Sequence, residues 1–435
     1  MSSKTSPKMS PAARQFIDKV IGLSTSLNAQ TEADALVVKR EAAQQQLLSL
    51  GLPTRKDEDW QYTSIQPLLQ QDFRLSETVS TAELSLAQLE PFLPDFETIR
   101  LVFVDGEFSE SLSAGFEYIP DGLSIEMADA DAIQSIALPE TADAFQWINE
   151  LLLDQGLTIQ LDAQIVLEVP LHILFVQTQS GTVLTPRLQV HLGEAAQCQL
   201  LQHFVCLADE TLTWVNGVGQ ITLEAGATCK QVVLQDLSDS SFYFNHQTTT
   251  QATNSNFEST YLALGSQLSR HHSVAQQQGD AAETTQDSIV PGRDQQLLDT
   301  RTLTQHHALH GQSRQLHKMV LGDAARGVFA GMIEVAKGAQ KTDGQMDIKS
   351  LLLSPQAKVD AKPQLEIYAD DVKCSHGCAA GQIDEDQLFY AQARGIRRTD
   401  AMQLITQAFL LEPLEKFQVQ PAMQAWLTQR VVDKL

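Results

Sequence analysis

Basic residues, cysteines and long apolar runs are all scarce in this sequence of 435 residues, and each scarcity excludes a class of protein. Only 30 Lys and Arg stand against 54 Asp and Glu, and the net charge of −24 would repel nucleic-acid phosphates and anionic lipid surfaces. No apolar run approaches the roughly 20 residues of a membrane span, and the first residues lack the apolar core of a secretion signal. We therefore expect a cytoplasmic protein that binds neither nucleic acid nor a membrane.

The cysteines and the missing motifs argue against a disulfide framework, nucleotide binding and the common types of enzyme. The five cysteines are an odd number and none precedes Cys198, which suits free thiols in a reducing compartment better than a disulfide framework. The sequence has no GxxxxGKS/T phosphate loop, no GxGxxG, no GxSxG, no HExxH and no CxxC pair. We therefore expect no nucleotide bound by this chain and no enzyme activity of its own.

The chain has a composition typical of a folded protein, with 43% hydrophobic residues, and its length suggests two or three structural units. Two helical patterns fill residues 11–50, the segment GLPTRKDEDWQYT reads as a connector with one short helix, and IRLVFVDGEF predicts two strands around an Asp-Gly turn. We divide the chain into an N-terminal helical region (1–95), short strands and a connector (96–156), a β core (157–382) and a C-terminal helical region (383–435).

The β core consists of many short runs rich in Val, Ile, Leu and Thr, such as HILFVQT and LEIYA. A weak repeat joins VHLGEAAQCQLLQ to ITLEAGATCKQVVLQ and separates Cys198 from Cys229 by 31 residues. A period near 30 with tight corners indicates a mainly β fold in which coils stack their strands in parallel, that is, a parallel β-helix. A large β-sandwich would also give short strands and turns, and the pattern alone leaves that alternative open.

A helical hairpin is predicted after Gly381. Asp384 and Gln387 have the spacing of a capping box, Gly395 has the place of a C-terminal glycine, and Thr399 can cap the second helix. The second helix carries its apolar residues on one stripe. The members of this stripe are Ala401, Leu404, Ile405, Ala408 and Phe409.

This hairpin is a candidate docking surface for another protein, because its apolar stripe lies beside the tight turn Arg394-Gly395-Ile396. Arg394, Arg397 and Arg398 also allow a DNA-reading helix-turn-helix, but the acidic residues around them leave no basic surface. Protein docking is therefore the better interpretation.

All eleven histidines lie between His172 and His376, with a pair at 271 and 272 and a cluster from 306 to 317. Imidazoles in clusters can form a metal or proton-relay site. Because no Asp or Glu at ligand spacing accompanies these clusters, we expect polar histidines on the outside of strands and loops.

The segment YADDVKCSHGCAAG (368–381) gives a sharper signal. Cys374 and His376 are two residues apart, so in a strand both side chains project from one face, where a thiolate and an imidazole can share a metal ion. Two ligands are too few to complete a metal site, so the remaining ligands would come from a partner chain. A cysteine and a histidine that merely end a strand stay an equal alternative, and Cys378, after Gly377, is expected to pack where the chain turns.

Four segments resemble the SufB/SufD family of the SUF iron–sulfur cluster assembly system. They are YADDVKCSHGCAAGQIDEDQLFYAQARGI, AMQLITQAF, GLPTRKDEDWQYT and LVFVDGEFS. Within the family, the length and the pair Cys374 and His376 are nearer to the SufD branch. The resemblance implies a right-handed parallel β-helix with helical regions at both ends, in a scaffold subunit that is not an enzyme.

The resemblance also implies partners. A SufB-like paralogue would pair with the β-helix to give a heterodimer, or a second copy would do so when the chain is alone, and sulfur-delivery proteins would act through the complex. A SufC-like ABC ATPase would dock on the C-terminal helices, at Arg394, Gly395, Ile396, Leu404, Ile405, Ala408 and Phe409. A transient iron–sulfur cluster would form at the interface, shared with the partner, with Cys374 and His376 as ligands on this side.

A β-helix enzyme that acts on carbohydrate is the alternative from another class, since a fold does not fix a function. Such enzymes are usually secreted and need an acidic or calcium-binding groove. The absence of a secretion signal makes this alternative the weaker one.

Overall fold

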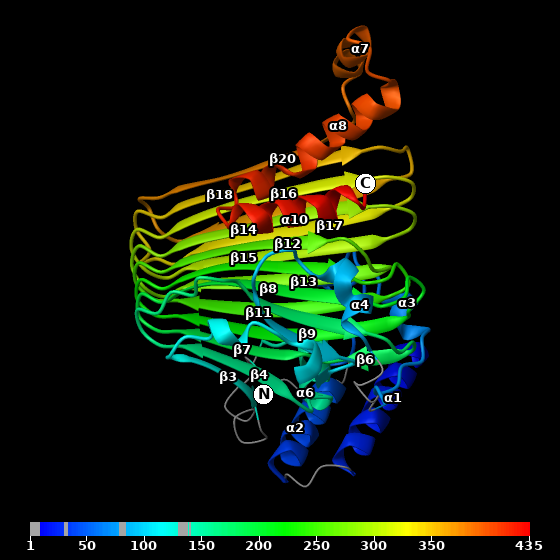
Figure 1. Cartoon of the computed structure of the whole chain (residues 1–435), viewed down its shortest axis with the longest axis vertical. Helices are drawn as coiled ribbons and strands as arrows, with labels where there is room; N and C mark the ends of the chain where they lie inside the picture. Colours follow the sequence, from blue (N-terminus) through cyan, green and yellow to red (C-terminus); the bar gives the residue numbers. More distant parts are fainter. Residues whose placement is uncertain (1–8, 30–33, 78–83, 129–137, 139–140) are drawn as a thin grey trace.

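The computed structural model describes residues 9–29, 34–77, 84–128, 138 and 141–435 of the chain. Strands dominate it, and they stack in two sheets that wind around a common interior, with helices at both ends of the chain (Figure 1). The mainly β fold with a parallel β-helix core and N- and C-terminal helical regions is therefore confirmed.

The first of the two sheets is sheet B. Its spatial order is β2 (Glu107–Phe108), β1 (Ile99–Val104), β5 (Leu171–Gln177), β8 (Gln197–Cys206), β10 (Thr228–Asp236), β12 (Asn256–Ala263), β14 (Glu283–Gly292), β16 (Gln312–Leu321), β18 (Asp343–Leu352) and β20 (Lys373–Gly381). It contains the even-numbered strands from β8 onward, together with three strands from earlier in the chain.

The facing sheet, sheet A, contains the strands between them. Its spatial order is β3 (Leu123–Ala128), β4 (Gly156–Leu161), β7 (Arg187–Leu192), β9 (Thr213–Leu223), β11 (Phe242–Gln251), β13 (Leu268–Gln277), β15 (Leu297–His306), β17 (Arg326–Val335) and β19 (Lys358–Ile367), with β6 (Thr182–Leu184) beside β9.

The register of the strands explains the weak sequence repeat. Cys198 lies beside Cys229, one coil of 31 residues away, and Leu268 lies beside Leu297, one coil of 29 residues away. From β4 onward the neighbours in both sheets are parallel, which excludes the antiparallel sandwich. The hairpin of β1 and β2 around Asp105-Gly106 is present as expected, and β1 also pairs in parallel with β5 and so extends sheet B.

The interior of the β-helix is apolar over much of its length but carries a polar part in its later coils. Gln231 and Gln247 exchange hydrogen bonds of 2.7 and 2.6 Å, and His317 hydrogen-bonds Ser288 at 2.8 Å. His271, His306 and His317 are buried, so the expectation of surface histidines is wrong for these three. Asn245 beside His271 and Ser288 beside His317 lie on the preceding coil, 26 and 29 residues away in the sequence, which is why the local pattern resembled a solvent-facing surface.

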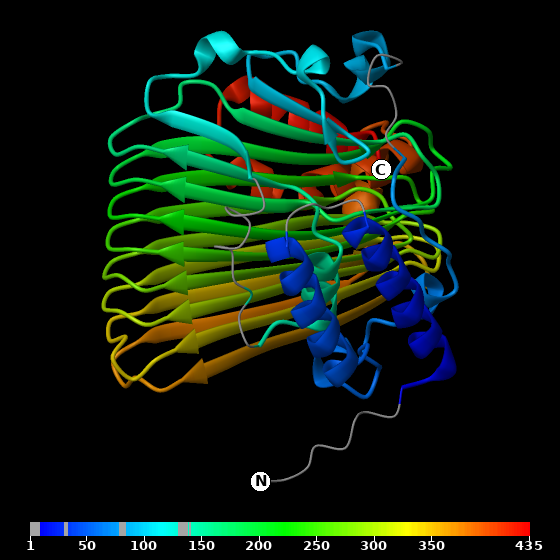
Figure 2. The ribbon, with the colours of Figure 1, turned by 90° about the horizontal axis from the view of Figure 1, so that it is seen from below.

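The N-terminal helices cover the outer face of sheet A. Ser10 caps α1 (Pro11–Asn28) by accepting a hydrogen bond from the backbone N–H of Ala13, and Gly51, at φ 71°, follows the end of α2 (Asp34–Leu50). Figure 2 shows these two helices side by side. Together with α6 (Ala144–Leu151) they bury apolar side chains against Trp214 and Phe242 of the sheet.

The connector after α2 runs over the outer face of sheet A. Its short helices are η1 (Glu58–Trp60) and α3 (Gln66–Leu69). The Trp60 ring stacks on Phe145 and Phe244, and the Arg270 guanidinium lies 3.7 Å from its centroid. Further short elements follow in the chain, namely α4 (Leu86–Leu89), η3 (Glu90–Phe92), η4 (Glu110–Leu112) and η5 (Phe116–Tyr118).

The C-terminal helices cover part of the outer face of sheet B. They are the end of α8 (Arg398–Leu410), α9 (Glu412–Lys416) and α10 (Pro421–Val432), whereas α7 (Glu385–Ala393) packs on α8 and projects away from the sheets (Figure 1). Leu410, Leu414 and Leu427 are buried there against Leu201 and Val232 of the sheet. The predicted helical tail is therefore present, and it forms a second apolar layer of the fold.

The caps of the hairpin differ from the expected ones. Asp384 does cap α7, but by accepting a hydrogen bond from the N–H of Asp386. Helix α8 begins at Arg398 after Arg397, so Thr399 lies inside the helix and the expectation that it is the cap is wrong. Gly395 has φ 85°, the left-handed conformation that ends a helix.

Candidate functional site

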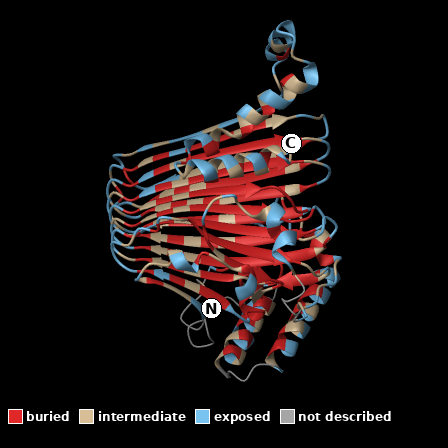
Figure 3. Cartoon of the chain, in the orientation of Figure 1, coloured by how far each residue is buried: buried red, intermediate tan, exposed pale blue. Residues whose placement is uncertain are grey.

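The last coil of the β-helix is uncovered. Strands β19 and β20 each have a strand partner on one side only within the described residues, and their residues are half-buried or exposed along their whole length. Figure 3 shows this end of the molecule in tan and pale blue, where earlier coils are red. A sheet edge of this kind presents unpaired backbone N–H and C=O groups to another chain.

Cys374 and His376 lie on one face of β20, and this face points to the interior between the two sheets. Cys374 pairs in register with Gly344 of β18, and His376 pairs with Met346, which is buried in the interior core. Register neighbours in a sheet project to the same side. The two side chains therefore lie at the uncovered mouth of the β-helix.

Cys378 was expected to pack after a turn, and this expectation is wrong. Strand β20 continues through Gly377 to Gly381, and Cys378 is exposed beside Ile348, on the same face as Cys374 and His376. A Cβ at Gly377 would lie 2.5 Å from a carboxylate oxygen of Asp347, so the glycine leaves room for that side chain, and the strand continues through it without a turn.

The electrostatics of this face favour a protonated Cys374. Partial burial raises the pKa of its thiol, the Asp343 carboxylate adds to the rise, and a hydrogen bond from the Gly344 backbone opposes both. In the described part of the chain, no three His, Cys, Asp or Glu side chains come together as a metal-binding group. The thiols and the imidazole of β20 therefore supply only part of a ligand set.

The inward face of the opposite strand, β19, offers no ligands at this mouth. The side chains of β19 that continue the buried interior positions of β17 are all apolar. They are Val359, Ala361, Pro363, Leu365 and Ile367. Every soft or nitrogen ligand that faces inward from the last coil thus comes from β20.

A second candidate surface lies on the hairpin of α7 and α8, which projects past β20 (Figure 1). A groove of about 540 Å³ runs between the two helices. Its lining includes Tyr390, Arg394, Ile396, Leu404 and Ile405. Four of the predicted docking residues are therefore together in one groove.

The remaining predicted docking residues lie elsewhere. Gly395 forms the turn, Ala408 is exposed but lines no part of the groove, and Phe409 packs at the base of the hairpin, 4.1 Å from the Lys318 ammonium. The predicted docking residues do not include Phe389 and Tyr390, whose side chains are 72% and 60% exposed. The signal in the sequence was two adjacent aromatic residues in a predicted helix that has no long apolar stripe.

An ion pair anchors the base of this hairpin to sheet B. The Lys318 ammonium, almost fully buried, lies 2.6 Å from the carboxylate of Glu412, the first residue of α9. Hydrogen bonds from Lys318 and Lys416 lower the pKa of Glu412 to about 2. The hairpin is therefore joined to β16 by a charged contact at one end and is free at its tip.

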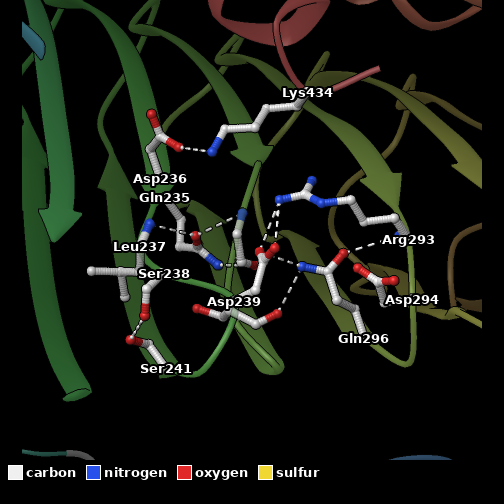
Figure 4. Close-up of polar contacts among 12 residues, drawn as sticks. Gln235, Asp236, Leu237, Ser238, Asp239, Ser241, Arg293, Asp294, Gln296 and Lys434 are labelled. Carbon is white, nitrogen blue, oxygen red and sulfur yellow. Dashed lines mark hydrogen bonds and ion pairs between the residues drawn. The ribbon is translucent and has the colours of Figure 1, made fainter. Parts of the chain in front are cut away.

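Helix α10 is anchored by a second charged contact, shown in Figure 4. The Asp236 carboxylate, at the end of β10, is 4% exposed and lies 2.7 Å from the Lys434 ammonium (Figure 4). It also lies 3.7 Å from the Arg430 guanidinium of α10. Nearby, the Arg293 guanidinium lies 2.9 Å from the half-exposed carboxylate of Asp239.

Replacing Asp236 with alanine should lower the free energy of unfolding by about 2 kcal/mol, because it leaves two cations without their shared carboxylate. Urea unfolding measures this loss. Asp239→Ala is the matched control, and since its ion pair is more exposed it should cost less than about 1 kcal/mol. Equal losses in the two variants would show that Asp236 has no special anchoring role.

None of the described helices is both long enough and apolar enough to cross a membrane.

Two family models match the chain. Residues 175–409 match the "SUF system FeS cluster assembly, SufBD core domain", and residues 13–173 match the "SufBD protein N-terminal region". The first match extends from β5 to the end of α8 and includes both candidate surfaces.

Curated proteins from bacteria and a plant are similar over most of the chain. The iron–sulfur cluster assembly protein SufD of Escherichia coli is 36% identical over 376 residues, which cover 85% of this chain and 86% of that protein. An iron–sulfur cluster assembly SufBD family protein of Synechocystis is 31% identical and covers 89% of this chain and 88% of its own length. The chloroplastic protein ABCI7 of Arabidopsis thaliana is 30% identical over 87% of this chain and 82% of that protein.

Proposed function

This chain belongs to the SufBD family of the SUF iron–sulfur cluster assembly system, and we propose that it is a scaffold subunit without enzyme activity of its own. In this proposal it pairs with a SufB-like chain, docks a SufC-like ABC ATPase and shares a transient cluster with the partner. The observation that carries the proposal is the uncovered strand β20, which presents Cys374 and His376 at the edge of the fold.

The pairing with a SufB-like chain is supported by the two free strand edges. Both β19 and β20 can add a strand of a partner, since their outer edges have no strand neighbour in the described chain. A second copy of this chain could use the same edges when the paralogue is absent. Either partner would cover the half-exposed apolar side chains of the last coil.

The docking of the ATPase is supported by the hairpin of α7 and α8. Its tip extends away from the β-helix, it carries exposed aromatic residues, and an apolar groove lies between its helices. Anchors of this type, with an aromatic or aliphatic side chain beside an Arg, dominate the binding energy of many protein interfaces. Nucleotide would then be bound by the ATPase and not by this chain.

The cluster, as cargo of the complex, fits the residues at the mouth. Cysteine thiolates are the usual ligands of iron–sulfur clusters, and histidine replaces cysteine at some irons. A ligand set divided between two chains suits a cluster that has to be handed on. Sulfur-delivery proteins would reach it through the assembled complex, in the cytoplasm, without contact to nucleic acid or membrane.

The alternative of an enzyme that acts on carbohydrate is supported only by the β-helix fold, which does not fix a function. The match to the SufBD family favours the scaffold function instead.

The double variant Cys374→Ala/His376→Ala tests the proposed cluster site. In a complex reconstituted with the SufB-like and ATPase subunits, it should lower the yield of cluster at least tenfold, because two ligands of the shared set are lost. Absorbance and iron content measure the cluster, and gel filtration with an ATPase assay verifies that the complex is intact.

Ser375→Ala is the matched control, since Ser375 lies between the two residues and projects to the opposite face of β20. It should leave the yield unchanged. A normal yield from the double variant in an intact complex would assign the cluster to the partner alone.

A further inference from the structure

Strand β20 carries three ligand-type side chains at equal spacing on one face. Cys374, His376 and Cys378 follow each other at i, i+2 and i+4, beside Gly344, Met346 and Ile348 of the preceding coil. Successive members are about 6.6 Å apart at their Cα atoms, and the two cysteines are about 13 Å apart. His376 is therefore the neighbour of both thiols.

One metal ion cannot bind both cysteines of this row. Two sulfurs bonded to the same ion lie at most about 4.6 Å apart, twice a metal–sulfur bond of about 2.3 Å. The Cα atoms of the two cysteines are about 13 Å apart, and even with both side chains turned toward each other their sulfurs stay further apart than this limit, in agreement with the lack of a three-ligand group in the described residues. The row consequently offers two alternative pairs, Cys374 with His376 or His376 with Cys378.

The two pairs differ in how accessible their thiols are. Cys374 is half-buried and packs against the interior core, whereas Cys378 and His376 are both exposed. Cys378 lies beside Ile348, which is fully buried, so the buried core ends at Ile348 and the Cys378 thiol is exposed at the mouth of the β-helix. An ion that arrives from solution meets a free thiol and a free imidazole only at His376 and Cys378.

We propose that His376 and Cys378 are the first pair of this chain to bind ferrous iron, before a partner covers the mouth of the β-helix. This proposal rests on the function proposed above and adds to it a site of entry for the metal. Cys374 then becomes a ligand in the closed complex, after the partner has covered the last coil. Binding forms one Fe–S and one Fe–N bond in place of two bonds from the hydrated ferrous ion to water, and the Cys378 thiol releases its proton to water without a change of oxidation state.

Alkylation of the cysteines tests the proposal on the full chain alone. Iodoacetamide is added under anaerobic conditions with and without ferrous iron, and mass spectrometry follows the labelling of each cysteine. Ferrous iron should slow the labelling of Cys378 at least fivefold and that of Cys374 less than twofold. In His376→Ala the protection of Cys378 should disappear, and in Ser375→Ala it should persist.

Protection of Cys374 in place of Cys378, or of neither cysteine, would overturn the proposal. Protection of Cys378 that survives in His376→Ala would do so as well, because the histidine would then be no ligand. These outcomes are distinct from a failure of the proposed function, which is judged by the yield of cluster in the assembled complex.

Discussion

Replacing both Tyr390 and Leu404 with aspartate should weaken the binding of the ATPase subunit at least 100-fold. The two side chains are 60% and 53% exposed and line the same groove, so the change adds two charges to an apolar docking surface without disturbing the core. A loss of 100-fold corresponds to about 2.7 kcal/mol, which one or two central residues of an interface commonly supply. Surface plasmon resonance with the purified ATPase measures the affinity.

Gln403→Asp is the matched control for this experiment. Gln403 is exposed on the same helix, next to Leu404, but does not line the groove. Its affinity should stay within threefold of the original chain. If the double variant binds the ATPase as well as this control, the docking surface lies elsewhere on the molecule.

Point variants are preferable here to a deletion of the C-terminal region. The sequence alone suggests that truncation after Gly381 removes the docking surface and leaves the β core intact. In the structure, α8, α9 and α10 bury Leu410, Met423 and Leu427 against sheet B. Truncation would expose this apolar layer, and a loss of binding could then reflect damage to the β core.

The architecture was predictable because it repeats along the chain. The 31-residue spacing of Cys198 and Cys229 is the length of one coil, and the two residues are register neighbours with sulfurs 3.9 Å apart. The pairing of β1 with β5 could not be predicted in this way, since the two strands are about 70 residues apart and belong to no repeat. Local patterns report the period of a fold, but not which distant strands become neighbours.

The candidate site was predictable in part. The spacing of Cys374 and His376 was enough to place them on one face of a strand. The interpretation of Cys378 failed because the glycine before it indicated a turn, whereas Gly377 lies within strand β20, beside Asp347 of β18. The groove of the hairpin depends on the packing of two helices, and this packing separates Phe409 from the residues with which it shares a stripe.

The buried histidines should make the free energy of unfolding fall steeply as the pH is lowered below 6.5. Burial lowers the pKa of His306 to about 4 and that of His317 to about 3, and it also lowers the pKa values of His172, His203 and His271. The unfolded chain takes up protons at these histidines below its pKa of about 6.5, while the folded chain does not. Each such histidine therefore costs about 1.4 kcal/mol of stability per pH unit down to its folded pKa.

One carboxyl opposes this trend without reversing it. Burial raises the pKa of Asp287 to about 7, so the folded chain takes up a proton there as the pH falls below 7, and stability increases. The folded chain takes up one proton at Asp287, whereas the unfolded chain takes up one at each of the five histidines named above, so the loss of stability is the larger effect. Since a typical domain is stable by about 5–15 kcal/mol, we expect unfolding well above pH 4. Urea unfolding at pH 7.5, 6.5 and 5.5 measures the slope.

A pair of histidine variants separates this effect from the general charge of the chain. His317 hydrogen-bonds Ser288 and Gln315 inside the β-helix, and glutamine can keep such contacts without titrating. His317→Gln should reduce the slope by about 1.4 kcal/mol per pH unit between pH 6.5 and 4.5. His307→Gln, at an exposed position directly after β15, is the matched control for the substitution itself. A flat stability from pH 7.5 to 5.5 would mean that the interior admits protonated imidazoles, so the polar side chains and any water between the sheets would have to solvate charge.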